Sequence, residues 1–184
     1  MKTKEDKMFN LLYTLTKLHQ SGLGVFQLNK LAFLYEYFHI KNFGERYTFD
    51  RFIKLPHGPV ITNYKNTIKK AAENTVLDAD IHAIWNNNGW QNHSHTIQII
   101  RPGRNLLNAG INTEAQYNLA IAVIKKFADM KPKDLEKFVY STQPVKRFLE
   151  LEAAGHKYTS VLRGDVIKLK DYKSDAQKGM KRYH

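Results

Sequence analysis

The sequence predicts an α+β protein that is predominantly α-helical, a helical bundle around one buried central helix with a small β element. Most of the chain carries apolar residues at steps of three and four, the spacing of amphipathic helices. The segment from about 27 to 41 is apolar around nearly its whole circumference, which is typical of a helix buried on all sides. Two strand-like runs within about 81–100 flank a turn-forming stretch at 86–89, and they predict a β-hairpin or small meander.

The size and composition favour one domain with a true core. Of the 184 residues, 42% are hydrophobic and 12% are aromatic, so disorder is not expected. We predict a single domain over 1–172 and a basic, frayed tail over 173–184. The absence of cysteine excludes disulfides, thiolate zinc sites, iron–sulfur clusters and a cysteine nucleophile. The first residues do not resemble a signal peptide and no stretch is apolar enough to span a bilayer, so we expect a cytoplasmic protein without a membrane partner.

Further helices follow from apolar spacing and from residues that start or stop helices. The first is predicted over 4–19, before the glycines at 22 and 24. Thr113 and Gln116 suit a capping box at the start of a helix that reaches 130. Pro132 is well placed to begin the next helix, which Gln143-Pro144 breaks before helical spacing resumes over 145–154.

The stretch "LPHGPV" at 55–60 packs two prolines, a glycine and a histidine into six residues. A proline pushes the residue before it out of helical conformation, so Leu55 and Gly58 are expected in a turn or extended, and Gly58 is a candidate for positive φ. Pro59 suits the first position of a helix, where its missing N–H costs nothing. We therefore predict a rigid turn that feeds a helix over 59–74, after a short extended run within 45–53.

The charge of the chain points to acidic partners. There are 29 basic and 17 acidic side chains, a formal charge of +12. Beside the region 157–182, the predicted basic surface comprises Arg46, Arg51, Lys54, Lys65, Lys69 and Lys70. An acidic protein is the preferred partner; nucleic acid is the weaker alternative, because no segment reads as a recognition helix.

Candidate catalytic groups are few. His57 precedes a predicted helix N-terminus, and Asp50 or Glu45 would be its orienting partner if it acted as a general base. His93 and His95 would share a strand face, with His82 as a third metal ligand, but no further ligands lie near them in the sequence. Nucleophile elbows and phosphate-binding loops are missing. We predict no enzyme, no metal and no cofactor; the alternative is a hydrolase or metal enzyme that uses His57 or the His93/His95 pair.

A longer pattern extends around "LPHGPV". It joins 28–35, Phe38-His39, Gly44, 52–60 and Tyr64, and it resembles the Panacea domain of the SocA-like antitoxin family; 134–144 continues the resemblance, although Thr142 and Val145 stand where that family usually has His and Trp. The resemblance covers about 5–170. It implies a bacterial or phage protein that neutralises a protein toxin, usually encoded by an adjacent gene, by direct binding; regulation of its own operon by DNA binding is the alternative. The defining residues carried over, without an assigned role, are Leu31, Tyr35, His57, Gly58, Pro59, Val60 and Tyr64.

Overall fold

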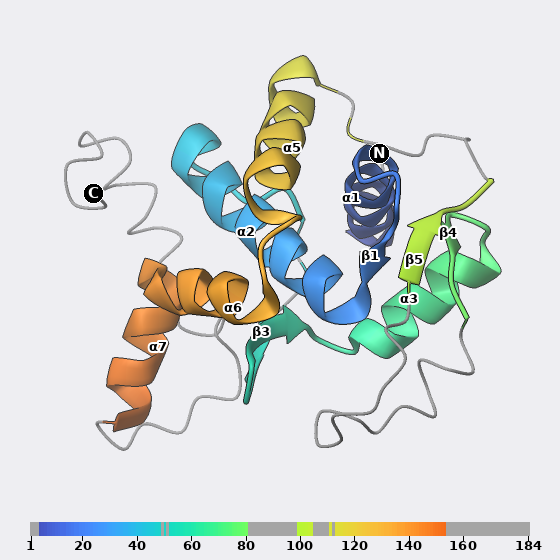
Figure 1. The fold of residues 1–184 in the computed structure, drawn as a ribbon. Helices are drawn as coiled ribbons and strands as arrows, with labels where there is room; N and C mark the ends of the chain where they lie inside the picture. Colours follow the sequence, from blue (N-terminus) through green and yellow to red (C-terminus); the bar gives the residue numbers. More distant parts are fainter. Residues whose placement is uncertain are drawn as a thin grey trace.

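The computed structural model describes residues 4–48, 50, 52–80, 99–104, 111 and 113–153. Within these residues the chain forms six helices and five short strands, which confirms the predominantly helical α+β class (Figure 1). None of the described helices combines the length and apolarity that crossing a membrane requires. In chain order the elements are α1 (Lys4–Leu18), β1 (Leu23–Gly24), α2 (Val25–Phe43), β2 (Phe52–Leu55), β3 (Gly58–Ile61), α3 (Tyr64–Glu73), β4 (Leu77–Asp78), β5 (Ile99–Pro102), α5 (Glu114–Phe127), α6 (Pro132–Ser141) and α7 (Gln143–Ala153).

Helix α2 is the central element of the fold, as the sequence predicts. It contacts α1, α5, α6 and β3, and it runs through the middle of the molecule in Figure 1. It is two residues longer at each end than predicted. Gly44 ends it in a left-handed conformation (φ 72°), and the Gly44 N–H donates to the Ile40 carbonyl over 2.8 Å. Glycine adopts this conformation without the steric cost that a Cβ brings.

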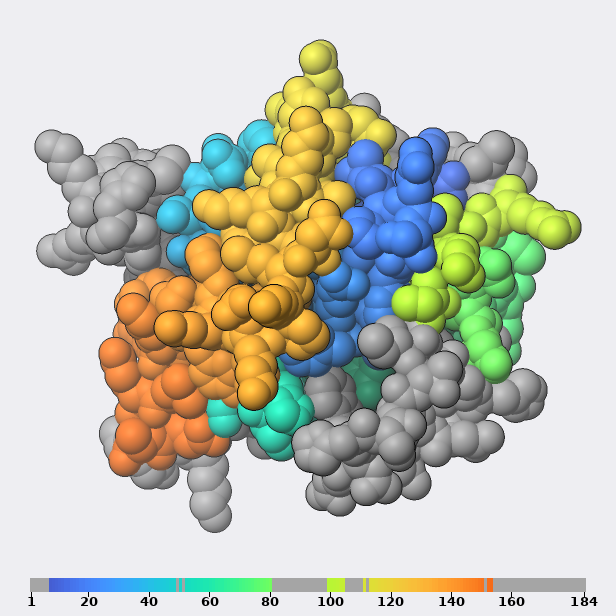
Figure 2. Space-filling model, in the orientation of Figure 1, coloured from blue at the N-terminus to red at the C-terminus, as the bar shows by residue number. Residues whose placement is uncertain are grey.

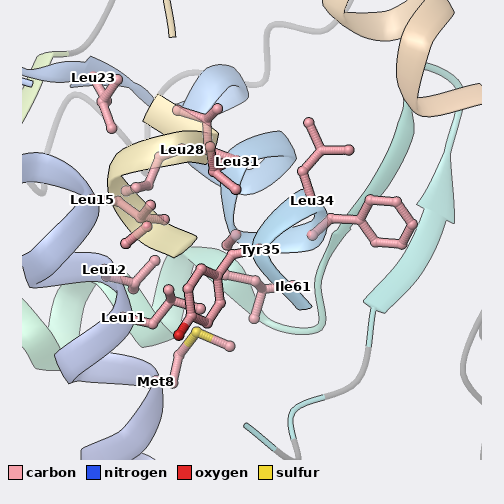
Figure 3. Packing of buried hydrophobic residues seen from close by; sticks show 14 of the residues in the cluster. Met8, Leu11, Leu12, Leu15, Leu23, Leu28, Leu31, Leu34, Tyr35 and Ile61 are labelled. Atoms are coloured by element: carbon pink, nitrogen blue, oxygen red, sulfur yellow. The ribbon is translucent and has the colours of Figure 1, made fainter. Parts of the chain in front are cut away.

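The core is built around α2, and one part of it lies between α1 and α2. Leucines from both helices interdigitate, and the ring of Tyr35 fills the space between the two helices and β3 (Figure 3). Fully burying one such leucine contributes about 1.5–3 kcal/mol, so this layer contributes substantially to stability. The residues of the cluster that Figure 3 labels are Met8, Leu11, Leu12, Leu15, Leu23, Leu28, Leu31, Leu34, Tyr35 and Ile61.

A small antiparallel β element is present, as the sequence predicts. Residues 81–98, which include most of the predicted hairpin, lie outside the described part of the chain. Ile99 and Ile100 do form a strand, but that strand extends to Pro102 and pairs antiparallel with two partners far away in sequence. In the register Leu23 is opposite Ile100 and Leu77 is opposite Pro102, which gives a three-stranded sheet in the order β1-β5-β4.

The prediction of a helix from Pro59 is wrong. Strands β2 and β3 form an antiparallel hairpin with Leu55 opposite Gly58 and Lys54 opposite Pro59, so "LPHGPV" contains a hairpin turn. Helix α3 begins only at Tyr64, after Asn63 in left-handed conformation (φ 57°). A proline is tolerated in a strand where its missing N–H faces away from the ladder. Pro59 occupies such an edge position.

The later helices follow the predicted boundaries more closely. The Thr113 hydroxyl caps α5 by accepting from the Gln116 N–H over 3.3 Å, and α6 begins at Pro132. Helix α7 begins at Gln143, two residues earlier than predicted. The break that Pro144 predicted is reduced to a single non-helical residue, Thr142, because a proline in the first turn removes no helical hydrogen bond.

A buried carboxylate holds the segment after α2. Glu36, only 3% exposed, accepts the N–H groups of Tyr47 (3.0 Å) and Thr48 (2.7 Å) and also the Thr48 hydroxyl. Arg46 lies 3.6 Å away and supplies the opposite charge. A buried carboxylate is tolerated when hydrogen bonds and a countercharge replace its lost hydration. Glu36 thus fixes the path by which the chain enters β2.

Replacing Glu36 by glutamine tests this role. We expect Glu36→Gln to lower the free energy of unfolding by about 3 kcal/mol, because Arg46 loses its buried countercharge and an amide group then faces backbone donors. Urea denaturation followed by circular dichroism measures the change. Exposed Glu150 offers a matched control, and Glu150→Gln is expected to stay within about 0.5 kcal/mol of the unsubstituted protein. Equal stability of the two variants would contradict the role given to Glu36.

Candidate functional site

The candidate site is the β2–β3 hairpin and the two helices that hold it. The hairpin packs against the first half of α2 and beneath α6, and part of its teal surface emerges beside α6 in Figure 2. The family-like residues divide by exposure. Leu31, Tyr35, Gly58, Pro59 and Val60 are buried, whereas His57 and Tyr64 are partly exposed.

Two consecutive residues of α2 close the outer edge of β3. The Asn29 side-chain oxygen accepts the Ile61 N–H over 3.0 Å, and the Lys30 ammonium donates to the Pro59 carbonyl over 2.9 Å. Residues two apart in a strand direct their backbone groups to the same edge, so these two contacts serve one edge. The Asn29 amide also donates to the Val25 carbonyl over 2.9 Å, which fixes its orientation.

Lys30 is a cation in an apolar setting. Its residue is 0% exposed, and its ammonium lies 4.9 Å from the centre of the Phe26 ring. Burial lowers the pKa of Lys30 from 10.5 to about 7, even though the nearby Glu136 carboxylate raises it. An ammonium carries three donors. Among the described residues, its one hydrogen bond is to Pro59.

Helix α6 holds the hairpin turn from the other side. The Tyr140 hydroxyl donates to the Pro56 carbonyl over 2.9 Å, and the Glu136 carboxylate lies 3.4 Å from His57 Nδ1. Burial raises the pKa of Tyr140, and the negative charges of Glu136 and Glu152 raise it further. The turn is therefore held in place between α2 and α6. We define the tip surface as His57, Glu136 and Tyr140, with Lys30 beneath them.

Gly58 is at the most crowded point of this turn. Its φ of +95° is one that residues with a side chain rarely adopt, in line with the positive φ considered from the sequence. A Cβ at this position would lie 3.2 Å from Tyr140 Cε2 and 3.5 Å from the Lys30 ammonium. The glycine allows α6 and Lys30 to approach the backbone closely.

The partner of His57 is not one of those expected from the sequence. The carboxylate that pairs with His57 across the fold is that of Glu136, which is far away in sequence. His57 and Glu136 have side chains that are 43% and 29% exposed, so the pair lies at the surface. No group of three or more metal-ligating side chains occurs in the part of the chain that the structure describes, and His82, His93 and His95 lie outside it.

Sequence reasoning did not single out three groups of the site, namely Lys30, Glu136 and Tyr140. The sequence did contain one signal. Asn29 and Lys30 follow each other in a helix that is apolar on all sides, so both side chains need buried hydrogen-bond partners. Glu136 and Tyr140 are four residues apart and so share a helix face. Their contact with residues 56–57 depends on the tertiary fold.

Tyr35 and His39 belong to a different polar network, in the second half of α2. The Tyr35 hydroxyl donates to the Gln116 carbonyl over 3.3 Å, and the Gln116 amide and His39 Nε2 are 3.0 Å apart. His39 Nδ1 donates to the Glu45 carbonyl over 2.6 Å, and burial lowers the pKa of this imidazole. These contacts tie α2 to α5, which gives Tyr35 a structural role.

The predicted basic surface is only partly present. Arg46 is buried beside Glu36 at 7% exposure, so its placement on the surface was wrong: the buried carboxylate draws the guanidinium inward. Lys54 pairs with Glu152 over 3.3 Å and Lys69 with Glu73 over 3.7 Å. Arg51 and the basic region 157–182 lie outside the described residues. Ion pairing lowers the net positive charge that these lysines offer to phosphates.

A comparison of two glycines tests the crowding at the turn. Gly58→Ala is expected to lower the free energy of unfolding by about 1 kcal/mol or more, because positive φ and the contact with Tyr140 both oppose a Cβ. Gly44 has a similar positive φ but no atom within 4 Å of the added Cβ, so Gly44→Ala carries the backbone strain alone. Chemical denaturation should give a lower free energy of unfolding for Gly58→Ala than for Gly44→Ala. The reverse order would contradict the close packing described here.

The lowered pKa of Lys30 predicts how stability varies with pH. Below about pH 7 the ammonium is charged in the folded and unfolded states alike, and the cost of burying it is complete. Between about 7 and 10.5 the unfolded chain keeps a proton that the folded protein has lost, so the contribution of Lys30 to the free energy of unfolding rises with pH. One such group gives a slope of at most about 1.4 kcal/mol per pH unit. Denaturation curves measured across this pH range should show that the free energy of unfolding rises with pH in the unsubstituted protein relative to Lys30→Met. Parallel pH profiles of the two proteins would contradict the lowered pKa of Lys30.

Comparison with known proteins identifies the domain to which this geometry belongs. The family model described as antitoxin SocA-like, Panacea domain, matches residues 28–144. No curated protein and no solved structure matches the chain. The matched segment starts next to Asn29 and Lys30, includes the hairpin, and ends after α6, so it contains every residue of the tip surface. Since the match spans more than half of the 184 residues, the chain belongs to the SocA-like antitoxin family and carries a Panacea domain.

Proposed function

We propose that this protein is an antitoxin that neutralises a protein toxin by binding to it directly. The observation that carries the proposal is the match to the SocA-like antitoxin family over residues 28–144. Membership of this family implies a toxin partner, and we place the gene for that toxin beside the gene for this chain. Neutralisation by binding requires only a complementary surface and no particular chemistry of the toxin.

The geometry of the hairpin turn supports a binding role. Its backbone is held by Lys30 at Pro59 and by Tyr140 at Pro56, so the turn is ordered before any partner arrives. Association loses free energy whenever loops and side chains must become ordered, and a surface that is already rigid avoids this loss. A partly exposed histidine and tyrosine on such a surface are suited to anchoring a partner.

The same contacts favour binding over catalysis. A general base must be within reach of a substrate proton, and a reactive lysine must be accessible. Lys30 is fully buried and donates to a backbone carbonyl, while Tyr140 also donates to a backbone carbonyl. Lys30 and Tyr140 thus hold the hairpin. A non-enzymatic antitoxin is the function that this arrangement supports best; DNA binding stays a prediction from charge alone.

Co-expression with the adjacent gene tests the proposal. We expect the product of that gene to arrest growth of a bacterial host when it is induced alone, and this protein to restore growth and to co-purify with it. Intact-mass measurement of the toxin recovered from the complex should give an unchanged mass, and its activity should return after dissociation.

A copy of this gene with an early stop codon serves as the control for the co-expression. Growth rescue without a complex, or a toxin of altered mass, would favour an enzymatic mechanism instead. If the adjacent protein is neither toxic nor bound, the proposed function is wrong.

A further inference from the structure

The buried cation beneath the tip surface is incompletely neutralised. Lys30 has a neutral carbonyl and an aromatic ring as its direct neighbours, and the carboxylate that acts on it, Glu136, is at the same time paired with His57. Two of the three ammonium donors make no hydrogen bond to the described residues. The pKa of Lys30 stays near 7 despite Glu136, so this carboxylate does not offset the cost of burial.

Two ionisable side chains of the tip surface lie near Lys30. The hairpin contributes His57, and the carboxylate of Glu136 on α6 raises the pKa of Lys30. Lys54 on β2 forms an ion pair with Glu152 on α7 over 3.3 Å, so its charge already has a partner. Among the described residues, the titratable and charged groups with contacts at the turn are Lys30 on α2, Lys54 and His57 on the hairpin, Glu136 and Tyr140 on α6, and Glu152 on α7.

We propose that the tip surface is where the partner binds, and that it takes an acidic segment whose aspartate or glutamate side chain binds beside His57 in competition with Glu136. This inference rests on the proposed function and specifies its contact surface. A second carboxylate at this place would supply the negative charge that Lys30 lacks. The partner need not touch Lys30, because a charge in a poorly hydrated interior acts over several ångströms with little screening.

The exposure of the tip surface suits this occupant. His57 is 43% exposed and can donate to an incoming carboxylate, and the ring of Tyr140 lies beside it at Gly58, where it offers apolar contact area. The formal charge of +12 on the whole chain would steer an acidic partner toward it and accelerate association. A basic segment would instead have to pair with Glu136 above a buried cation, which is electrostatically less favourable.

The sign of one substitution distinguishes an acidic from a basic partner. At a pH low enough to keep Lys30 protonated in both proteins, we expect Glu136→Gln to bind the toxin of the adjacent gene about threefold more tightly, the size of one partly exposed charge contact, because the competing carboxylate is gone. Lys30→Met should bind about threefold more weakly, since the attracting charge is lost. Glu73→Gln, on α3 and away from the tip surface, is the matched control and should leave the affinity unchanged. Isothermal titration calorimetry measures all four proteins.

Proton exchange on binding gives a second readout that a change in folding does not mimic. An incoming carboxylate raises the pKa of Lys30, so near pH 7 the complex should take up protons, seen as a binding enthalpy that varies with the ionisation enthalpy of the buffer. Lys30→Met should abolish most of this uptake. Proton release, weaker binding by Glu136→Gln, or identical behaviour of Glu136→Gln and Glu73→Gln would overturn the inference. In those cases the unsubstituted protein still neutralises the toxin, whereas failure of the unsubstituted protein to bind would reject the proposed function as well.

Discussion

The position of the β2–β3 hairpin depends on two hydrogen bonds from α2 to the outer edge of β3. Without the Asn29 oxygen and the Lys30 ammonium, the Ile61 N–H and the Pro59 carbonyl would be buried without partners. Each such group costs about 1–3 kcal/mol when left unsatisfied. A hairpin of two four-residue strands cannot bear that cost alone. The position of the turn, and hence of His57, follows from these two α2 side chains.

The buried polar residues of α2 determine which segment of the chain packs at each position along this helix. Its leucines pack against any apolar surface of suitable shape, so they stabilise the bundle without choosing among arrangements. Asn29 and Lys30 form hydrogen bonds with β3. Glu36 accepts hydrogen bonds from the backbone of 47–48, and His39 contacts Gln116 on α5. Each contact is satisfied in one arrangement only, and buried polar groups left unsatisfied penalise the others. We infer that these residues give the fold its specificity and the leucines give it its stability.

Local signals explain what the sequence could and could not predict. Helix α2 and the starts of α5 and α6 were predictable because apolar spacing, Thr113 and Pro132 act within a few residues. Pro59 satisfies the rules for a helix start and for an edge strand equally well, and the contacts of β3 with Asn29 and Lys30, which are distant in sequence, favour the strand. The pairing of His57 with Glu136 and the burial of Arg46 are likewise tertiary effects. The motif residues were therefore identifiable from the sequence, whereas the contacts that give them a role were not.

The lysine under the turn links stability to recognition. An apolar side chain at position 30 would avoid the cost of burying a charge, and such replacements are often neutral or stabilising in proteins. It would also leave the Pro59 carbonyl without its donor and remove the positive potential beneath His57. Binding surfaces commonly retain groups that are unfavourable for folding where those groups become favourable in the complex. An acidic side chain delivered by a partner would convert the charge of Lys30 from a cost in the free protein into an attraction in the complex.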